Sequence, residues 1–205
     1  MEGEPGTAPI SVATSASLLA ALSDPDNRTV WNQYVGRYRP LLVRYGRRLG
    51  LGADEAEDVA QQTLLTFSTS YRAGRYELGK GRLRSWLFGI ARNELLQFRR
   101  RGRRDVQAPE SRGGDGLFDQ IAAREDLEAV WEQEWRKAVL GACLEQVRRE
   151  VQPQSYEAFD LFALQGRPAV EVAARLGVTP NAVFLAKRRI LHRVRELLPL
   201  VDDLW

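Results

Sequence analysis

The amino-acid sequence predicts an all-α protein made of two small helical domains. Apolar residues recur at helical spacing in one segment after another, and Pro and Gly gather in the gaps between these segments. Residues 105–120 contain a Pro and three Gly with no sustained periodicity, which is typical of an interdomain linker. We therefore expect a disordered tail at 1–14, a first domain at 15–104, this flexible acidic linker, and a second domain at 121–205.

The composition excludes several classes of protein. Among 205 residues there is one cysteine, Cys143, and one histidine, His192, too few for a disulfide framework or a structural zinc site. The N-terminal segment carries Glu2 and Glu4 in place of basic residues, and no run approaches the roughly 18 apolar residues of a membrane span. We expect a cytoplasmic protein with no cofactor, no metal ion and no membrane contact.

Caps and helix breakers set out the start of the first domain. A short helix is predicted at 17–22. Residues 24–26, Asp-Pro-Asp, then resemble an N-cap, a first-turn proline and a first-turn acid, and they predict the start of a longer helix. Gly50 and Gly52 are expected to end this helix. Its apolar residues follow at helical spacing: Trp31, Tyr34, Val35, Tyr38, Leu41, Leu42 and Tyr45. Pro40 removes a backbone donor, so we expect it to kink this helix or to begin a second one.

Two further helices, at 54–71 and 83–101, are joined by a Gly-rich loop. The first has one apolar stripe: Val59, Thr63, Leu64 and Phe67. The second is expected to bury another: Leu83, Leu87, Ile90, Glu94 and Phe98. Its remaining stripe is different in kind: Trp86, Gly89, Asn93, Gln97 and Arg100. Aromatic rings, amides and guanidinium groups stack on bases, bond to base edges and hold phosphates, so this stripe is a candidate nucleic-acid surface. For Trp86 alone, a place in the core is the commoner alternative.

Charge is concentrated in blocks. Residues 82–104 hold eight Arg against the single Glu94, residues 105–134 hold nine acids against two Arg, and residues 180–196 hold five basic residues against Glu196. Two basic patches on a nearly neutral chain favour a polyanion contacted at two places. Solvated helix faces are the alternative, although five Arg within residues 99–104 favour nucleic acid.

The second domain is predicted to begin with a long helix at 121–151, ended by Pro153, and a further helix at 156–164 that stops at Gly166. Helix-turn-helix signals follow: a short helix from Pro168, a turn at Gly177, Thr179 as N-cap, and a longer basic helix. We expect the two helices to pack through apolar residues: Val170, Val172, Ala173, Leu176 and Val178 against Val183, Ile190, Val194 and Leu197. The opposite face can enter a DNA major groove: Asn181, Leu185, Arg188, His192 and Arg195. A generic helical hairpin is the alternative.

Three segments in this order carry a family resemblance: EAEDVAQQTLLTF at 55–67, LRSWLFGIARNELLQFRRR at 83–101, and the helix-turn-helix at 168–195. With the acidic linker between them, they resemble the extracytoplasmic-function (ECF) type of sigma factor in the sigma-70 family. These are the two-domain initiation subunits of bacterial RNA polymerase. The likeness covers nearly all of 30–198, and it implies a promoter-melting first domain and a second domain that binds the upstream promoter element.

The resemblance also implies core RNA polymerase and promoter DNA as partners. Acids and amides of the helix at 54–71 would bind the clamp helices of the largest polymerase subunit: Glu55, Glu57, Asp58, Gln61 and Gln62. A second set of residues would recognise and melt the minus-ten element and capture a flipped base: Tyr76, Lys80, Trp86, Asn93, Gln97, Arg99, Arg100 and Arg101. Binding of the minus-thirty-five element would fall to a third: Thr179, Asn181, Phe184, Leu185, Lys187, Arg188, Arg189 and His192. The polymerase flap is a further implied contact.

The chain departs from the family pattern in its recognition helix. Family members commonly have Arg, Ser and Arg after the valine, whereas Phe184, Leu185 and Ala186 follow Val183 here, and the basic groups come a turn later. Gln62 stands where an acid is frequent. The acidic stretch at 105–134 would either run through the nucleic-acid path of the polymerase or serve as a solubilising tether.

Other partners and functions stay open at this level. An anti-sigma factor and a regulatory kinase are both compatible with the sequence, and Thr63 and Thr66 are the hydroxyls considered for phosphorylation. A helix-turn-helix regulator that binds operators, or a helical adaptor for an acidic protein, are the alternative functions, but both leave the helix at 83–101 unexplained. No convergent carboxylate set, phosphate loop or nucleophile motif points to an enzyme.

Overall fold

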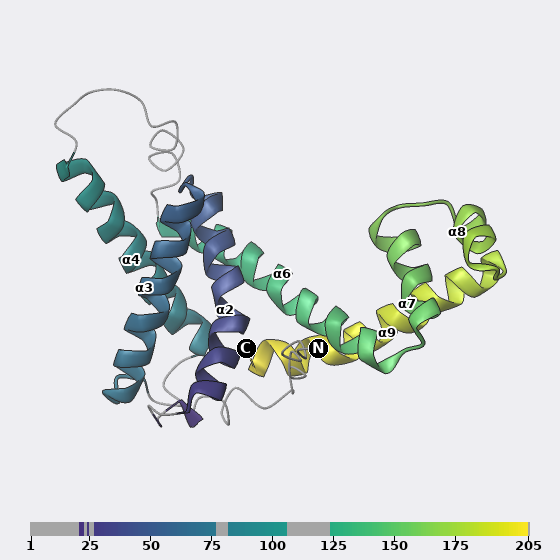
Figure 1. Ribbon diagram of the computed structural model, residues 1–205, viewed down its shortest axis with the longest axis horizontal. Coiled ribbons are helices and arrows are strands. Elements are labelled where there is room, and N and C mark those ends of the chain that lie inside the picture. The colour runs from purple at the N-terminus through teal and green to yellow at the C-terminus, as the bar shows by residue number, and fades with distance from the viewer. Residues whose placement is uncertain (1–20, 23, 25–26, 77–81, 106–123, 205) are drawn as a thin grey trace, which may run out of the picture. The chain divides into compact units, whose positions relative to one another are not determined.

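The computed structural model describes residues 21–22, 24, 27–76, 82–105 and 124–204, and these residues are built from helices (Figure 1). In chain order the elements are α2 (Arg28–Arg48), α3 (Ala53–Arg72), α4 (Leu83–Asp105), α6 (Arg124–Glu150), α7 (Pro153–Phe159), the π-helical turn η1 (Asp160–Leu164), α8 (Ala169–Leu176) and α9 (Pro180–Leu204). No strand occurs in the described ranges, so the predicted all-α class is confirmed. The predicted tail at 1–14, nearly all of the linker and Lys80 lie outside them.

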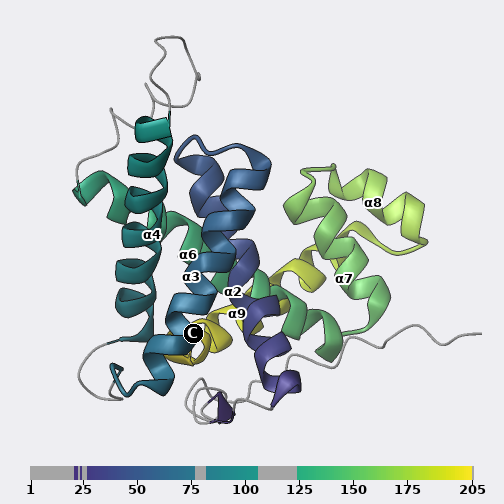
Figure 2. The ribbon, with the colours of Figure 1, turned by 60° about the vertical axis from the view of Figure 1, so that its left-hand side comes forward.

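The chain forms two compact units, and the boundary between them lies between Arg136 and Lys137, inside α6. In the first unit α3 packs against both α2 and α4 (Figure 2). Its core is largely aromatic and aliphatic: Tyr34, Tyr38, Leu41, Tyr45, Leu64, Phe67, Leu87 and Leu95, with Trp131 and Trp135 from α6. The part of α6 before Lys137 therefore packs in the first unit. The functional domain boundary at 120–121 stays a prediction.

The start of α2 differs from its prediction, and one of the two alternatives for Pro40 is excluded. Its N-cap is Asn27, whose side chain accepts a hydrogen bond from the Val30 amide at 3.2 Å, and not the Asp-Pro-Asp group. Pro40 lies inside α2, and no second helix begins there. The proline removes one backbone hydrogen bond, while its neighbours Tyr38 and Leu41 are fully buried, so packing offsets the lost bond.

A tight turn joins α2 to α3. Gly50 has a φ of 86°, a conformation that glycine adopts at little cost. The Gly52 amide donates to Oε2 of Glu55 at 2.7 Å, which caps the start of α3. A Cβ on Gly46 would lie 3.2 Å from the Cβ of Ala56, so the small residue permits the close approach of the two helices. The predicted helix at 54–71 and its buried stripe are confirmed.

The second unit contains the predicted helix-turn-helix. The axes of α8 and α9 meet at a bend of 102°, within the range usual for this motif. Gly177 adopts a left-handed conformation with a φ of 65°, and the Thr179 hydroxyl accepts from the Ala182 amide at 3.2 Å as the predicted cap. A small core joins η1, α7, α8 and α9: Ala158, Leu161, Val172, Ala173, Val183 and Ala186.

Two local expectations for this unit are corrected. Val170 does not pack against α9, because its side chain is 71% exposed at the start of α8. The helix α6 ends at Glu150, and Pro153 is the first residue of α7 instead of the end of α6. Among the described residues no single helix is long and apolar enough to cross a membrane, and only the bent α8–α9 pair reaches that length and composition.

Candidate nucleic-acid interface

The helix α4 buries one face in the first unit. The buried side chains are Leu83, Leu87, Phe88, Ala91 and Leu95. The prediction that Leu83 and Leu87 are buried is confirmed. Further along α4, however, the buried residues are Phe88, Ala91 and Leu95, and not the predicted Ile90, Glu94 and Phe98. These last three are half-buried, at the edge of the buried face. There the Thr66 hydroxyl donates to Oε1 of Glu94 at 2.8 Å.

Another face of α4 is open, and it contains the predicted reading stripe. Asn93, Gln97 and Arg100 are exposed, and with Trp86 they follow one another at helical spacing over about 21 Å. A Cβ added to Gly89 would meet no atom within 4 Å, so the surface between Trp86 and Asn93 is unobstructed. Along the helix, the open face thus presents the ring of Trp86, the position of Gly89 with no side chain, the amides of Asn93 and Gln97, and the guanidinium of Arg100.

At one end of this face the rings of Tyr76 and Trp86 stack. Their centroids are 4.8 Å apart with an interplanar angle of 23°, and Trp86 also packs on Phe67 at 4.8 Å. Both rings are half-buried. Burial, and then the neighbouring Tyr71, raise the pKa of Tyr76, so its hydroxyl stays neutral at physiological pH. The structure therefore brings two predicted minus-ten residues into one aromatic pair.

The arginines at the other end divide into two kinds. Arg100 and Arg101 are exposed, and Nη2 of Arg101 donates to Oε1 of Gln97 at 3.4 Å. Arg99 is half-buried, and its Nη2 donates to the carbonyl of Leu49 at 3.1 Å. This hydrogen bond ties α4 to the end of α2. Arg99 thus has a structural role that the sequence did not indicate.

Two of the predicted polymerase-binding residues, Glu57 and Gln61, line a groove between α2 and α3. The groove has a volume of about 310 Å³ and is lined by Trp31, Val35, Arg39, Glu57, Gln61, Leu64 and Leu65. Glu57 pairs with Arg39 at 2.9 Å, whereas Glu55 caps its own helix at Gly52. Asp58, Gln61 and Gln62 are exposed. Sequence reasoning missed Leu65, which is 47% exposed; its place outside the apolar stripe of α3 was the available signal.

The two threonines considered for phosphorylation differ in access. Thr63 is fully buried, and its hydroxyl donates to the Val59 carbonyl at 2.7 Å, so a kinase has no access to it in the folded chain. Thr66 is partly exposed and bonds to Glu94. The hypothesis of a switch at Thr63 is therefore wrong for the folded protein.

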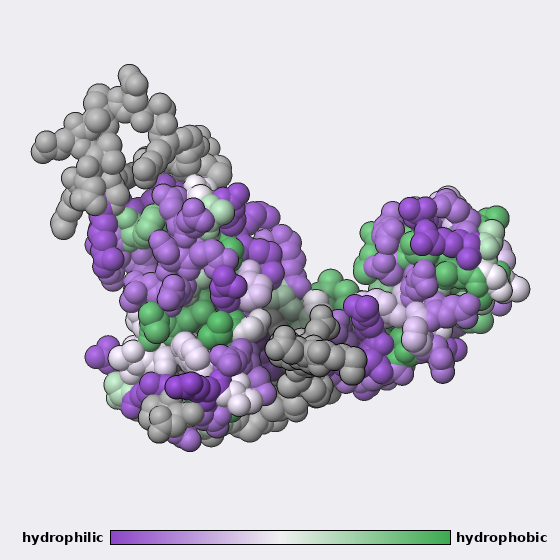
Figure 3. Space-filling model, viewed as in Figure 1, coloured by the Kyte–Doolittle hydropathy of each residue, from purple (hydrophilic) through white to green (hydrophobic). Residues whose placement is uncertain are grey.

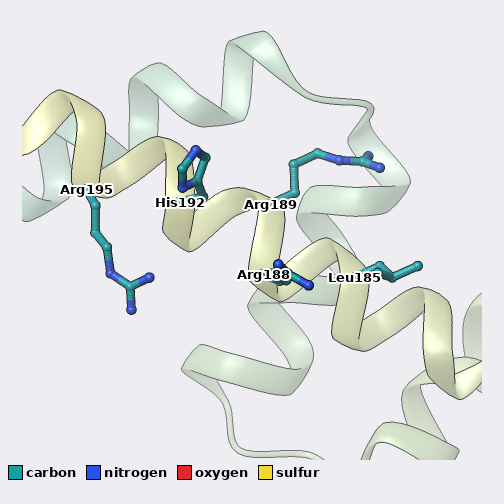
Figure 4. A pocket seen from close by; sticks show the side chains of 5 residues that line it. All are labelled: Leu185, Arg188, Arg189, His192 and Arg195. Carbon is teal, nitrogen blue, oxygen red and sulfur yellow. The ribbon is translucent and has the colours of Figure 1, made fainter.

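The helix α9 presents the second basic surface. Five of its side chains line a shallow hollow of about 520 Å³: Leu185, Arg188, Arg189, His192 and Arg195 (Figure 4). Thr179 and Asn181 are exposed at the start of the same helix. Phe184 and Lys187 lie to one side, where both contact the Phe162 ring, Phe184 edge-on at 5.2 Å and Lys187 at 5.1 Å.

The end of the acidic stretch is held by arginines of the first unit. Glu132 pairs with Arg84, and the buried Glu134 pairs with Arg44 and Arg48. These acids neutralise arginines of the same unit. The earlier part of the stretch lies outside the described residues.

Comparisons with known proteins show which sequences this chain is similar to. Residues 34–105 match the family Sigma-70 region 2. The chain is 28% identical over 195 residues to the ECF RNA polymerase sigma factor SigE of Mycolicibacterium smegmatis, covering 93% of this chain and 68% of that one. It is 28% identical over 184 residues to the ECF RNA polymerase sigma factor SigD of Mycobacterium tuberculosis, covering 86% and 81%.

A third relative has a higher sequence identity, over a shorter alignment. The RNA polymerase sigma factor CarQ of Myxococcus xanthus is 31% identical over 162 residues, covering 79% of this chain and 85% of CarQ. Among solved structures, CnrH in complex with the cytosolic domain of CnrY covers 89% of this chain and 95% of that one, with 23% identity and a TM-score of 0.34. On the sequence matches, the chain belongs to the ECF RNA polymerase sigma factors of the sigma-70 family.

Proposed function

We propose that this chain binds core RNA polymerase and directs promoter-specific initiation, by recognising and melting the minus-ten element and binding the minus-thirty-five element. The observation that carries the proposal is the open face of α4, with the Tyr76–Trp86 stack, two amides and two exposed arginines along one helix. Such a face offers stacking, hydrogen-bonding and phosphate-binding groups together.

Melting by this face requires no covalent chemistry. Contacts with unpaired bases exist only after the duplex has opened, so they shift the equilibrium towards the open state. The rings of Tyr76 and Trp86 supply a stacking surface, worth about 1–3 kcal/mol per base in proteins of this kind. Asn93 and Gln97 supply hydrogen bonds, and Arg100 and Arg101 hold phosphates. Lys80, outside the described residues, is proposed as a further contact with the minus-ten element.

Polymerase binding is assigned to the groove between α2 and α3. Leu64 and Leu65 are the apolar residues that α3 contributes to it, and Glu57 and Gln61 are the polar ones. Asp58 and Gln62 are exposed next to them in the chain. An apolar centre with a polar rim suits a helical partner, and the acids favour a basic one. The flap as a second polymerase contact, an anti-sigma factor, a regulatory kinase and a cytoplasmic location remain predictions.

The test is run-off transcription with purified core polymerase on a genomic fragment library. Wild-type protein should direct discrete start sites, and Asn93→Ala should weaken them by roughly ten-fold, since a good base contact contributes about 1–3 kcal/mol. Asn32→Ala, at an exposed asparagine of α2, is the matched control and should behave as wild type. DNA binding without any start site would instead favour an operator-binding regulator, and loss of all DNA affinity at low salt would favour an adaptor.

A further inference from the structure

An apolar side chain, Leu185, lies at the N-terminal end of the basic surface of α9. Leu185 is 49% exposed, and Asn181, Arg188 and His192 lie four residues before it and three and seven residues after it. These intervals place all four side chains on one side of a helix. Leu185 is thus an exposed leucine beside the arginines and the histidine that line the hollow (Figure 4).

Packing within the protein does not account for this leucine. The apolar core of the helix-turn-helix takes Val183 and Ala186 from the same turn of α9, and Leu185 is not part of it. Its neighbour Phe184 has a structural contact, edge-on to the ring of Phe162. Green residues interrupt the purple surface of the C-terminal unit in the space-filling view, so exposed apolar groups occur elsewhere on it (Figure 3). Leu185 differs from those groups because basic and amide side chains surround it.

The surroundings of Leu185 indicate what covers it. Arg188, Arg189 and Arg195 favour a polyanion, and Asn181 and Arg188 are the side-chain types that bond to the major-groove edges of adenine and guanine. Within the major groove only thymine presents an apolar group, its C5-methyl. A leucine against a guanine or cytosine edge would remove water from a donor or acceptor and give no hydrogen bond in return.

We infer that Leu185 reads a thymine through its C5-methyl group, at the position of the upstream element between those faced by Asn181 and Arg188. This inference rests on the proposed function, since it requires α9 to lie in the major groove of promoter DNA. It also accounts for the departure from the Arg-Ser-Arg pattern: a hydrogen-bonding reader is replaced by an apolar one.

The experiment uses the chain assembled with core polymerase. Duplexes that the assembly selects from a random library define the upstream element, and each thymine in it is then replaced singly by deoxyuridine, which lacks only the methyl group. Wild-type protein should lose about four-fold in affinity at one position, the value expected for one buried methyl group. Leu185→Ala should bind thymine and deoxyuridine equally at that position, whereas Leu185→Met should retain part of the difference.

A matched control separates this contact from general damage. Leu164→Ala, at an exposed leucine of η1, should keep the full methyl dependence of the wild type. Equal binding of thymine and deoxyuridine at every position, or a selected element with no thymine, would overturn the inference while leaving promoter recognition intact. An assembly that selects no sequence and starts no transcript would contradict the proposed function itself.

Discussion

The buried Glu134 forms an ion pair with the partly exposed Arg44, and this pair joins α6 to α2. The carboxylate of Glu134 is 1% exposed, and Nε of Arg44 donates to its Oε2 at 3.2 Å. On either side of it, Trp131 meets the ring of Tyr45 edge-on at 5.3 Å and Trp135 stacks with Tyr38 at 6.3 Å. The first half of α6 thus completes the core of the first unit, although the sequence pattern assigned it to the second domain.

Loss of this pair should destabilise the first unit. Glu134→Ala removes a buried acceptor for Arg44 and Arg48, and we expect the free energy of unfolding to fall by about 1–3 kcal/mol. The penalty stays moderate because both arginines are partly exposed and can be hydrated. Urea denaturation followed by tryptophan fluorescence measures it, since Trp131 and Trp135 lie beside the pair. Glu128→Ala, at an exposed glutamate of the same helix, should change the value by less than about 0.5 kcal/mol. Equal stability of the two variants would show that the pair contributes nothing.

The Tyr76–Trp86 stack predicts that the ring of Tyr76, and not its hydroxyl, supports promoter opening. Tyr76→Phe keeps the stack and should open promoter DNA as the wild type does. Tyr76→Ala removes one ring and should lower the open fraction by roughly ten-fold, because each stacked base contributes about 1–3 kcal/mol. Permanganate reactivity of unpaired thymines in the minus-ten region measures the open fraction. A defect in Tyr76→Phe as large as that in Tyr76→Ala would shift the role to the hydroxyl.

Gly89 allows the proposed DNA-binding face of α4 to be tested without harm to the fold. Alanine and glutamate both favour a helix over glycine, and a Cβ at this position meets nothing within 4 Å, so both variants should gain about 0.5–1 kcal/mol of stability. Gly89→Ala should keep activity in run-off transcription. Gly89→Glu places a negative charge between Trp86 and Asn93 and should repel DNA phosphates, which lowers activity strongly at low salt. Full activity of Gly89→Glu would place the DNA on another surface.

The second unit should lose stability in acid through Glu150. Hydrogen bonds from Arg193, and then from Gln146, lower the pKa of the Glu150 carboxyl. The folded pKa is thus below the unfolded one, so the pair stabilises the unit above the ordinary glutamate value of about 4.3, and this contribution is lost as the pH falls through the folded pKa.

Thermal unfolding at two pH values measures this contribution. Glu150→Gln should lower the Tm at pH 7, and its difference from wild type should shrink near pH 3, where the wild-type carboxyl is protonated too. Glu157→Gln, at an exposed glutamate of α7, is the control. A difference that stayed constant with pH would mean that the charge of Glu150 is not involved.

Several features could be predicted from local sequence because local physics controls them. The spacing of apolar residues identified α3, α4 and the two helices of the helix-turn-helix, and the Thr179 cap and the Gly177 turn were predicted at the residues where they occur. Exposure of Asn93, Gln97 and Arg100 followed from helical periodicity, since residues opposite an apolar stripe face water.

Tertiary structure decided what depends on residues far apart in the chain. Periodicity showed that Trp131 and Trp135 are buried but not against which helix, because a pattern specifies a face and not its partner. Likewise, the hydrogen bond of Arg99 to the Leu49 carbonyl spans 50 residues, and no local signal distinguishes Arg99 from Arg100. The sequence alone determined the helices and their polar and apolar faces. Three-dimensional packing decided which polar groups stay exposed and which, like Arg99, bond to a distant part of the same unit, because such contacts depend on residues far apart in the chain.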